Sequence, residues 1–124
     1  MNDKIKKYLN QNKSSSFSNL LFNLIDRKGL TDVEVYKKVS IDRRLFSKIR
    51  CNENYIPKKD NVIKLCFALS LKQDEVKELL DSAGYSLSTN NNFDLVVLFC
   101  IENNIYDINI ANDYLYTFTN TVLN

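Results

Sequence analysis

The stretch Thr31–Arg50, TDVEVYKKVSIDRRLFSKIR, predicts two short helices joined by a tight turn. Thr31 and Glu34 form a capping box, in which the hydroxyl and the carboxylate each bind a free backbone amide of the first helical turn. We therefore expect a first helix from Asp32 to Val39. Asp42 is a favourable N-cap, so a second helix is expected to begin directly after it.

The second helix, Arg43–Arg50, is predicted to have one apolar face and one cationic face. At about 100° per residue, three apolar side chains fall together and the polar ones fall opposite. The apolar set is Leu45, Phe46 and Ile49, and the outward set is Arg43, Arg44, Ser47, Lys48 and Arg50. In most soluble proteins a cationic helix face is simply solvated surface. The charge alone therefore does not indicate a binding surface, and the position of the helix in the fold has to be considered as well.

Apolar residues at helical spacing predict more helices on both sides of this stretch. The expected segments are Phe17–Ile25, Lys59–Leu69, Gln73–Ala83, Phe93–Ile101 and Asn109–Phe118. The segment FDLVVLFCI, which starts at Phe93, also has the composition of a strand. We favour a helix because Asp94 and Glu102 bracket it and its neighbours are helical. The predicted fold class is therefore all-α.

Composition divides the chain into three parts. Residues 1–16 are polar and lysine-rich and are expected to form a basic arm that is flexible or weakly helical. Residues 17–85 hold the helices around the Thr31–Arg50 stretch. The loop Ser86–Asn92, SLSTNNN, is rich in turn-forming residues and marks a boundary. Residues 93–124 are predicted to form a C-terminal helical extension.

The formal net charge of +2 conceals an uneven distribution along the chain. All 17 Lys and Arg lie in residues 1–80 with only 10 acidic residues, which gives that part an excess of +7. Residues 81–124 contain five acidic residues and no Lys or Arg. This asymmetry predicts that an anionic partner binds the basic part of the molecule, residues 1–80, and that the acidic part, residues 81–124, faces away from that partner.

Composition also argues against several kinds of chemistry. The chain has no histidine, and its three cysteines, Cys51, Cys66 and Cys100, are too far apart in sequence for a CxxC motif. Its two glycines are too few for a dinucleotide-binding or P-loop motif. We therefore predict a non-enzymatic cytoplasmic protein that uses no cofactor or metal and does not associate with a membrane.

The stretch Thr31–Arg50 resembles the helix-turn-helix of the lambda-repressor/Cro (XRE) family, and the resemblance extends from about Phe17 to Gly84. The matching positions are the apolar residues of the motif, the cap Asp42 and the helix introduced by Pro57; the apolar set is Val35, Val39, Ile41, Phe46 and Ile49. The resemblance implies a five-helix DNA-binding domain with an added C-terminal helical pair.

The resemblance also implies a role for each exposed residue. Arg43, Arg44 and Ser47 would read bases in the major groove, since arginine binds guanine through two hydrogen bonds. The residues expected nearer the DNA backbone are Lys37, Lys38, Lys48, Arg50, Lys58 and Lys59. The chain differs from the usual family pattern at three positions: Asp32 replaces a glutamine that touches DNA, Tyr36 replaces a small residue, and Ser40 replaces a glycine of the turn.

The C-terminal extension is expected to cover the domain or to pair two copies of it. A helix that is apolar all round is either buried centrally or used between subunits. The predicted dimer or packing surface consists of Phe93, Val96, Val97, Cys100, Ile101, Tyr114, Leu115 and Phe118. A homodimer would suit DNA recognition, because its two DNA-binding domains, here called heads, can read half-sites one helical turn apart.

The residues thus predict a sequence-specific regulator that binds double-stranded DNA, with Arg43–Arg50 as the recognition helix. The alternative is a non-catalytic protein-interaction module, such as an adaptor, an antitoxin-like partner or an inhibitor, on the same scaffold. Asp32, Tyr36 and the apolar Phe93 helix motivate that alternative. RNA binding is a weaker third option, because the narrow major groove of RNA suits a helix less well.

Overall fold

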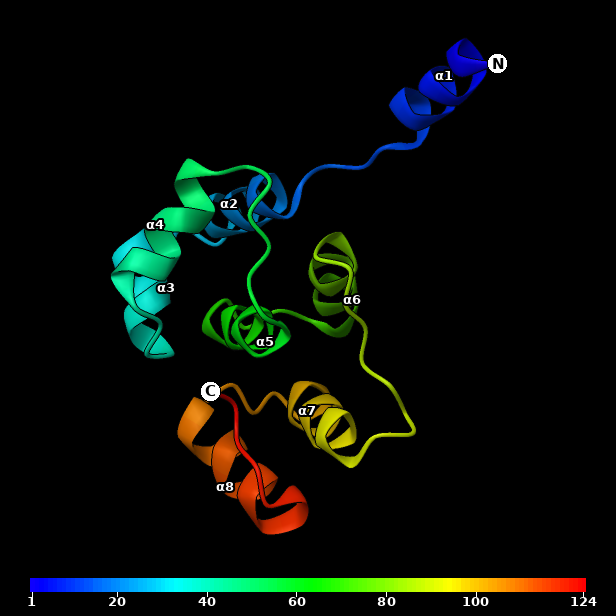
Figure 1. The fold of residues 1–124 in the computed structure, drawn as a ribbon. Coiled ribbons are helices and arrows are strands. Elements are labelled where there is room, and N and C mark those ends of the chain that lie inside the picture. Colours follow the sequence, from blue (N-terminus) through cyan, green and yellow to red (C-terminus); the bar gives the residue numbers. More distant parts are fainter.

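The computed structural model describes all of residues 1–124 and consists of eight helices and no strands (Figure 1). The helices are α1 (Asn2–Asn12), α2 (Phe17–Arg27), α3 (Asp32–Lys38), α4 (Arg43–Cys51), α5 (Lys59–Ala68), α6 (Gln73–Ser82), α7 (Asn92–Glu102) and α8 (Ile108–Thr119). The prediction of an all-α fold is confirmed, and the segment from Phe93, whose composition also suits a strand, is helix α7. No helix combines the length and the apolar character needed to cross a membrane.

Helix α5 lies at the centre of the fold. Every residue from Val62 to Leu69 is buried, although a lone amphipathic helix would bury only one face. Helices α3 and α6 pack against α5, and Figure 1 shows α7 and α8 on the side of α5 away from α2. The helices that precede α5 therefore form one part of the molecule and α7–α8 the other, with a shared core between them.

The C-terminal extension belongs to the same hydrophobic core as the rest of the molecule. That core consists of 28 buried residues, of which six lie beyond residue 93. Four residues of the predicted dimer or packing surface are fully buried within the chain: Val97, Cys100, Ile101 and Leu115. These four pack the extension onto the body, whereas Phe93 and Val96 are half-buried and Tyr114 and Phe118 are exposed. Any surface that this set offers to another molecule must therefore come from the half-buried and exposed residues, and not from the four buried ones.

Hydrogen bonds also fix the extension to the body. The Tyr106 hydroxyl donates to the Leu71 carbonyl at 2.8 Å, and the Gln73 side chain donates to Glu102 at 3.1 Å. The Tyr85 hydroxyl donates to the Pro57 carbonyl at 2.8 Å and holds the connection between α6 and α7 near the start of α5. The two halves are joined by specific polar contacts as well as by apolar packing.

Five helices end in the same way, which explains how so short a chain makes so many turns. Each is followed by a residue with positive φ and then by an apolar residue whose amide donates to the carbonyl five positions earlier. The pairs are Gly29–Leu30, Ser40–Ile41, Ser70–Leu71, Gly84–Tyr85 and Asn104–Ile105. This is the Schellman motif, which satisfies free carbonyl groups and turns the chain back onto the core.

The N-terminal arm, expected to be flexible or weakly helical, forms the helix α1. None of its residues is buried, and Figure 1 shows it standing away from the body. Its apolar residues Ile5, Tyr8 and Leu9 have the spacing i, i+3 and i+4, so they share one helix face. The overall polarity of residues 1–16 obscured this short stripe in the sequence.

Candidate nucleic-acid interface

Helix α4 is fixed to the body through its apolar face and at both ends. Phe46 and Ile49 are buried, as the sequence predicts. At the N-terminus, the Asp42 carboxylate accepts a hydrogen bond from the Arg44 amide at 2.7 Å. At the other end, the Ser18 hydroxyl of α2 donates to the Ile49 carbonyl at 2.9 Å. The cationic side of α4 is therefore presented on a helix that is anchored to the body along its apolar face and near both ends.

The turn between α3 and α4 is tight because Ser40 adopts a left-handed backbone conformation, with φ of 56°. The amide of Ile41 donates to the carbonyl of Tyr36 at 2.9 Å and closes the turn. The Tyr36 ring of α3 packs against the Phe46 ring of α4, with the centroids 5.4 Å apart. The departures at residues 36 and 40 are therefore accommodated within the helix pair.

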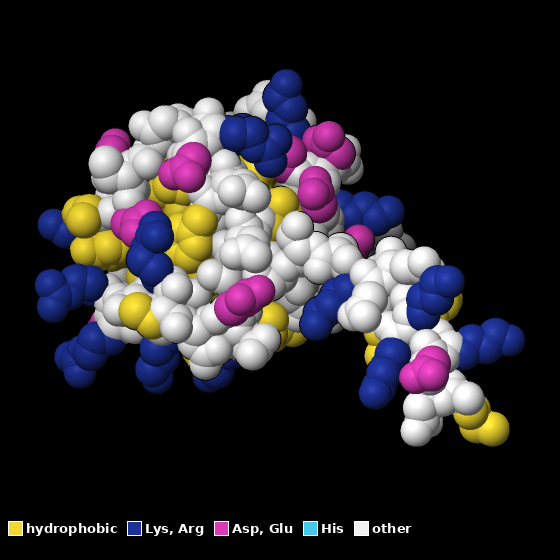
Figure 2. Space-filling view, turned by 90° about the horizontal axis from the view of Figure 1, so that it is seen from above, with side chains coloured by type: hydrophobic (Ala, Val, Ile, Leu, Met, Phe, Trp, Pro, Cys, Tyr) yellow, Lys and Arg dark blue, Asp and Glu magenta, His cyan; other side chains and the backbone are white.

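The outward face of α4 is cationic, as expected. Arg43, Arg44, Ser47 and Lys48 are exposed. Arg44 has the only ion pair among them, a 3.9 Å contact with Asp42, and its side chain is 91% exposed. An exposed pair of this length contributes little energy. Figure 2 shows Lys and Arg side chains projecting along the edge of the body where α3 and α4 lie.

Arg50 differs from the other cations of α4 because the chain itself engages it. Its guanidinium forms an ion pair with Asp32 at 2.6 Å and lies 3.9 Å from the centroid of the Phe22 ring. The charge of the Asp32 carboxylate is thus balanced by Arg50 of its own chain. Arg50 joins α4 to α2 and α3, a positioning role that the sequence did not indicate.

Lys59, also expected at the DNA backbone, is paired with Asp94 of α7. Its ammonium group lies 2.9 and 3.2 Å from the two carboxylate oxygens. Asp94 also accepts a hydrogen bond from the Ser88 amide at 2.8 Å, and its side chain is only 4% exposed. Lys59 is therefore a structural link between α5 and α7, whereas its neighbour Lys58 is exposed and has no ion pair.

Four of the six residues predicted at the DNA backbone remain available to a ligand. Lys37, Lys38, Lys48 and Lys58 are exposed and make no ion pair within the chain. They come from α3, from α4 and from the residue that precedes α5, so three neighbouring segments contribute. Of these, Lys48 lies on the outward face of α4 itself, whereas Lys38 lies beside Tyr106 and Asp107 at the start of α8.

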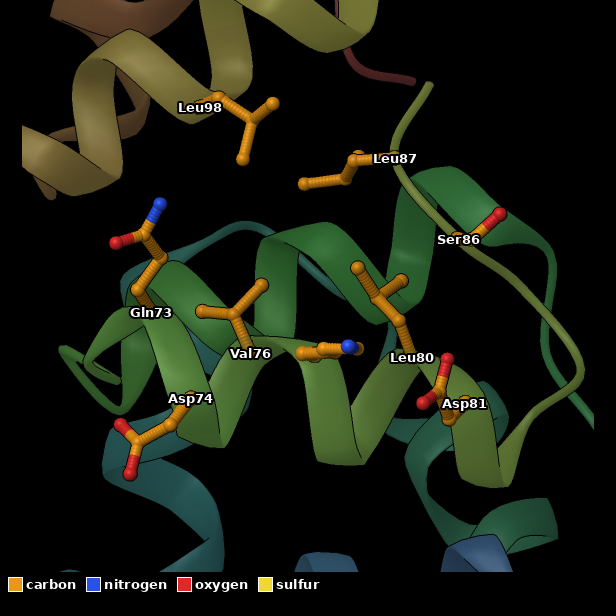
Figure 3. Close-up of a pocket in the computed structure, with 9 residues that line it drawn as sticks. Gln73, Asp74, Val76, Leu80, Asp81, Ser86, Leu87 and Leu98 are labelled. Atoms are coloured by element: carbon orange, nitrogen blue, oxygen red, sulfur yellow. The ribbon is translucent and has the colours of Figure 1, made fainter. Parts of the chain in front are cut away.

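A separate pocket of about 370 Å³ lies between α6 and α7 (Figure 3). Its apolar lining is Val76, Leu80, Leu87 and Leu98, and its rim includes Asp74 and Asp81. These two carboxylates are seven residues apart on α6, which places them about 10 Å apart along the helix axis. No group of three or more His, Cys, Asp or Glu side chains is arranged to hold a metal ion.

The three cysteines are free and occupy two different environments. Cys66 and Cys100 are buried, and burial raises the pKa of both thiols because it penalises the thiolate. Cys51 is exposed at the C-terminal end of α4, with its sulfur 4.0 Å from the Ser47 hydroxyl. Burial also lowers the pKa of Lys64, an effect that nearby Asp60 partly opposes.

Comparison of the chain with models of protein families, with curated proteins and with solved structures gives no match in any of the three.

Proposed function

We propose that the protein is a sequence-specific regulator that binds double-stranded DNA, with α4 as the recognition helix in the major groove. One observation supports this above all: the second of two short, tightly joined helices has an outward face of exposed cations. An α-helix fits the major groove, and its first residues reach the base edges. The proposal includes a lambda-repressor-like arrangement of the five helices within residues 17–85.

We assign base reading to Arg43, Arg44 and Ser47, which lie within the first five residues of α4. The phosphate contacts are assigned to the four cations that make no ion pair within the chain, Lys37, Lys38, Lys48 and Lys58. Arg50 and Lys59 are not assigned to DNA, because each already pairs with a carboxylate. Four phosphate contacts predict a slope of about −3.6 for log K against log salt per head.

A homodimer is part of this proposal. One head with two arginines and a serine reads few base pairs, and joining two heads multiplies weak single-head affinity. The exposed apolar residues of α7 and α8 offer a surface for pairing.

Selection from random duplex DNA, followed by gel shift at several salt concentrations, tests the proposal. Arg43→Ala and Arg44→Ala are expected to weaken binding to the selected site by about 1 to 3 kcal/mol. Lys77→Ala is the control, since it removes the same charge from α6 and should change affinity little. Absence of salt-dependent binding to random duplex or to the protein's own promoter region would rule the proposal out.

A protein-interaction module is the second candidate, and the exposed apolar residues of α7 and α8 favour it. A stable 1:1 complex with the product of a neighbouring gene would support this candidate. That support would be decisive if reversing the charges of Arg43 and Arg44 left the complex intact.

A further inference from the structure

Helix α1 has an apolar stripe that its own chain leaves without a partner. Ile5, Tyr8 and Leu9 are each more than half exposed. An isolated helix shorter than about 12 to 15 residues is marginal in water, and such helices usually gain stability by packing their apolar face. With 11 residues and no buried side chain, α1 needs an apolar surface to cover its stripe.

A groove of about 530 Å³ between α7 and α8 provides such a surface. Its lining, which we call the α7–α8 groove, is Asn92, Leu95, Val96, Phe99, Tyr114 and Phe118. The Phe99 and Tyr114 rings contact each other edge to face, 5.9 Å between centroids, and join the two walls. Side chains this large and this exposed, gathered on one face, mark an interaction surface.

The arm is basic and the C-terminal extension that carries the groove is acidic, while the groove lining itself contains no charged residue. Residues 1–13 contain four lysines and one aspartate, and Figure 2 shows Lys side chains along the projecting arm. Residues 81–124 contain five acidic residues and no Lys or Arg. Only Asp94 of these five forms an ion pair within the chain. A basic amphipathic helix therefore meets no repelling cation at the α7–α8 groove.

The helix that enters the groove must come from another copy of the chain. Figure 1 shows α1 and α7–α8 at opposite ends of the molecule. Residues 13–16 alone join α1 to α2, whose first residue, Phe17, is fixed in the core. Four residues span at most about 14 Å when fully extended, and the helix adds about 10 Å between Asn12 and Ile5, so the stripe stays within about 24 Å of the start of α2.

We propose that two copies of this chain exchange their N-terminal arms, so that the apolar stripe of each α1 lies in the α7–α8 groove of the other. Reciprocal exchange buries both surfaces and closes the assembly with two-fold symmetry. The proposal specifies the surface of the homodimer proposed above but does not depend on DNA binding. A direct pairing of two α7–α8 grooves, by contrast, would leave both α1 stripes exposed.

The α6–α7 pocket of Figure 3 is a poorer site for the arm. Its floor residues Val76 and Leu80 are already almost fully buried, so covering them removes little apolar area from water. The α7–α8 groove, by contrast, is lined by exposed apolar side chains such as Leu95, Phe99 and Phe118, so covering it removes more apolar area from water.

The test measures the mass of the full chain by size exclusion with light scattering and by sedimentation, without DNA. We expect a dimer whose dissociation constant rises about a hundredfold or more in Leu9→Asp and in Phe99→Asp, since each change puts a charge into an apolar contact. Asn10→Asp, on the opposite side of α1, and Tyr116→Asp, exposed on α8 outside the groove, add the same charge and should leave the dimer intact. Circular dichroism checks folding, and Leu95→Asp replaces Phe99→Asp if that variant unfolds.

Mixing the two defective variants gives the sharpest result. The Phe99→Asp chain keeps a normal arm and the Leu9→Asp chain keeps a normal groove, so an equimolar mixture should form a 1:1 heterodimer through one intact contact. A wild-type chain that stays monomeric at about 0.1 mM overturns the proposal, and so does a dimer that Leu9→Asp leaves unchanged. So does a mixture that stays monomeric. If Leu9→Asp weakened only DNA binding, the arm would serve DNA and the proposal would fail.

Discussion

Replacing Lys59 by methionine is expected to destabilise the fold while leaving the salt dependence of DNA binding unchanged. Asp94 is almost fully buried, and its two oxygens receive the Lys59 ammonium at 2.9 and 3.2 Å. Removing one partner of a buried pair costs about 3 to 5 kcal/mol, because the remaining charge is left uncompensated. The Lys59 side chain is 31% exposed, so water screens part of this interaction and we expect a loss of about 2 to 3 kcal/mol.

Thermal unfolding measures this loss directly. For 124 residues the entropy of unfolding is about 0.26 kcal/mol/K, so the expected decrease in Tm is about 8 to 12 °C. Asp94→Asn should cost less, since the neutral amide is cheaper to leave buried. The double variant should be more stable than the sum of the two losses predicts, because the two side chains interact.

Lys58 supplies the matched control, because it is the adjacent lysine and makes no ion pair. Lys58→Met is expected to change stability by less than about 0.5 kcal/mol. If Lys58 contacts a phosphate as proposed, its loss reduces the steepness of log K against log salt by about 0.9. The reasoning is refuted if Lys59→Met leaves Tm unchanged and reduces the salt slope instead.

Three further results are expected. Ser40→Gly should raise stability by about 0.5 to 1 kcal/mol, seen as a higher urea midpoint, because Ser40 has a positive φ of 56° that glycine adopts without steric cost. A thiol reagent should label Cys51 alone in the folded chain and all three cysteines in urea, because Cys66 and Cys100 are buried; rapid labelling of all three in buffer would contradict the packing. Burial raises the pKa of the Cys66 thiol, so above about pH 8.5 the unfolded chain loses this proton first and stability falls by about 1.4 kcal/mol per pH unit. Cys66→Ala should show a shallower alkaline decline of the urea midpoint than the wild type, and equal declines would count against a buried neutral thiol.

The features that could be predicted from sequence are those fixed by neighbours a few residues apart. The two faces of α4 follow from helical periodicity, so Phe46 and Ile49 are buried as expected and Arg43 is exposed. The capping box at Thr31 follows in the same way, from two side chains three residues apart. Helix bounds also agree closely, since caps and turn residues mark them.

The interactions that could not be predicted join residues distant in sequence. Arg50 pairs with Asp32, 18 residues away, and Lys59 pairs with Asp94, 35 residues away. Neither spacing has a meaning until the helices pack, because periodicity gives the face of a helix and not its neighbour. For this reason two cations with suitable positions along the sequence turned out to be held by carboxylates of their own chain.

Salt distinguishes the two proposed interactions, because they depend on charge to different degrees. Raising the salt fourfold, from 50 to 200 mM, should weaken DNA binding by a head with four phosphate contacts by about a hundredfold, since each contact releases a counterion. The arm exchange relies mainly on burying apolar residues such as Leu9 and Phe99, and its lysines stay near the surface, where ion pairs contribute about 0 to 1 kcal/mol. The dimer dissociation constant should therefore change several-fold at most over this range. A dimer as sensitive to salt as the DNA complex would show that the lysines of α1, and not its apolar stripe, hold the two copies together.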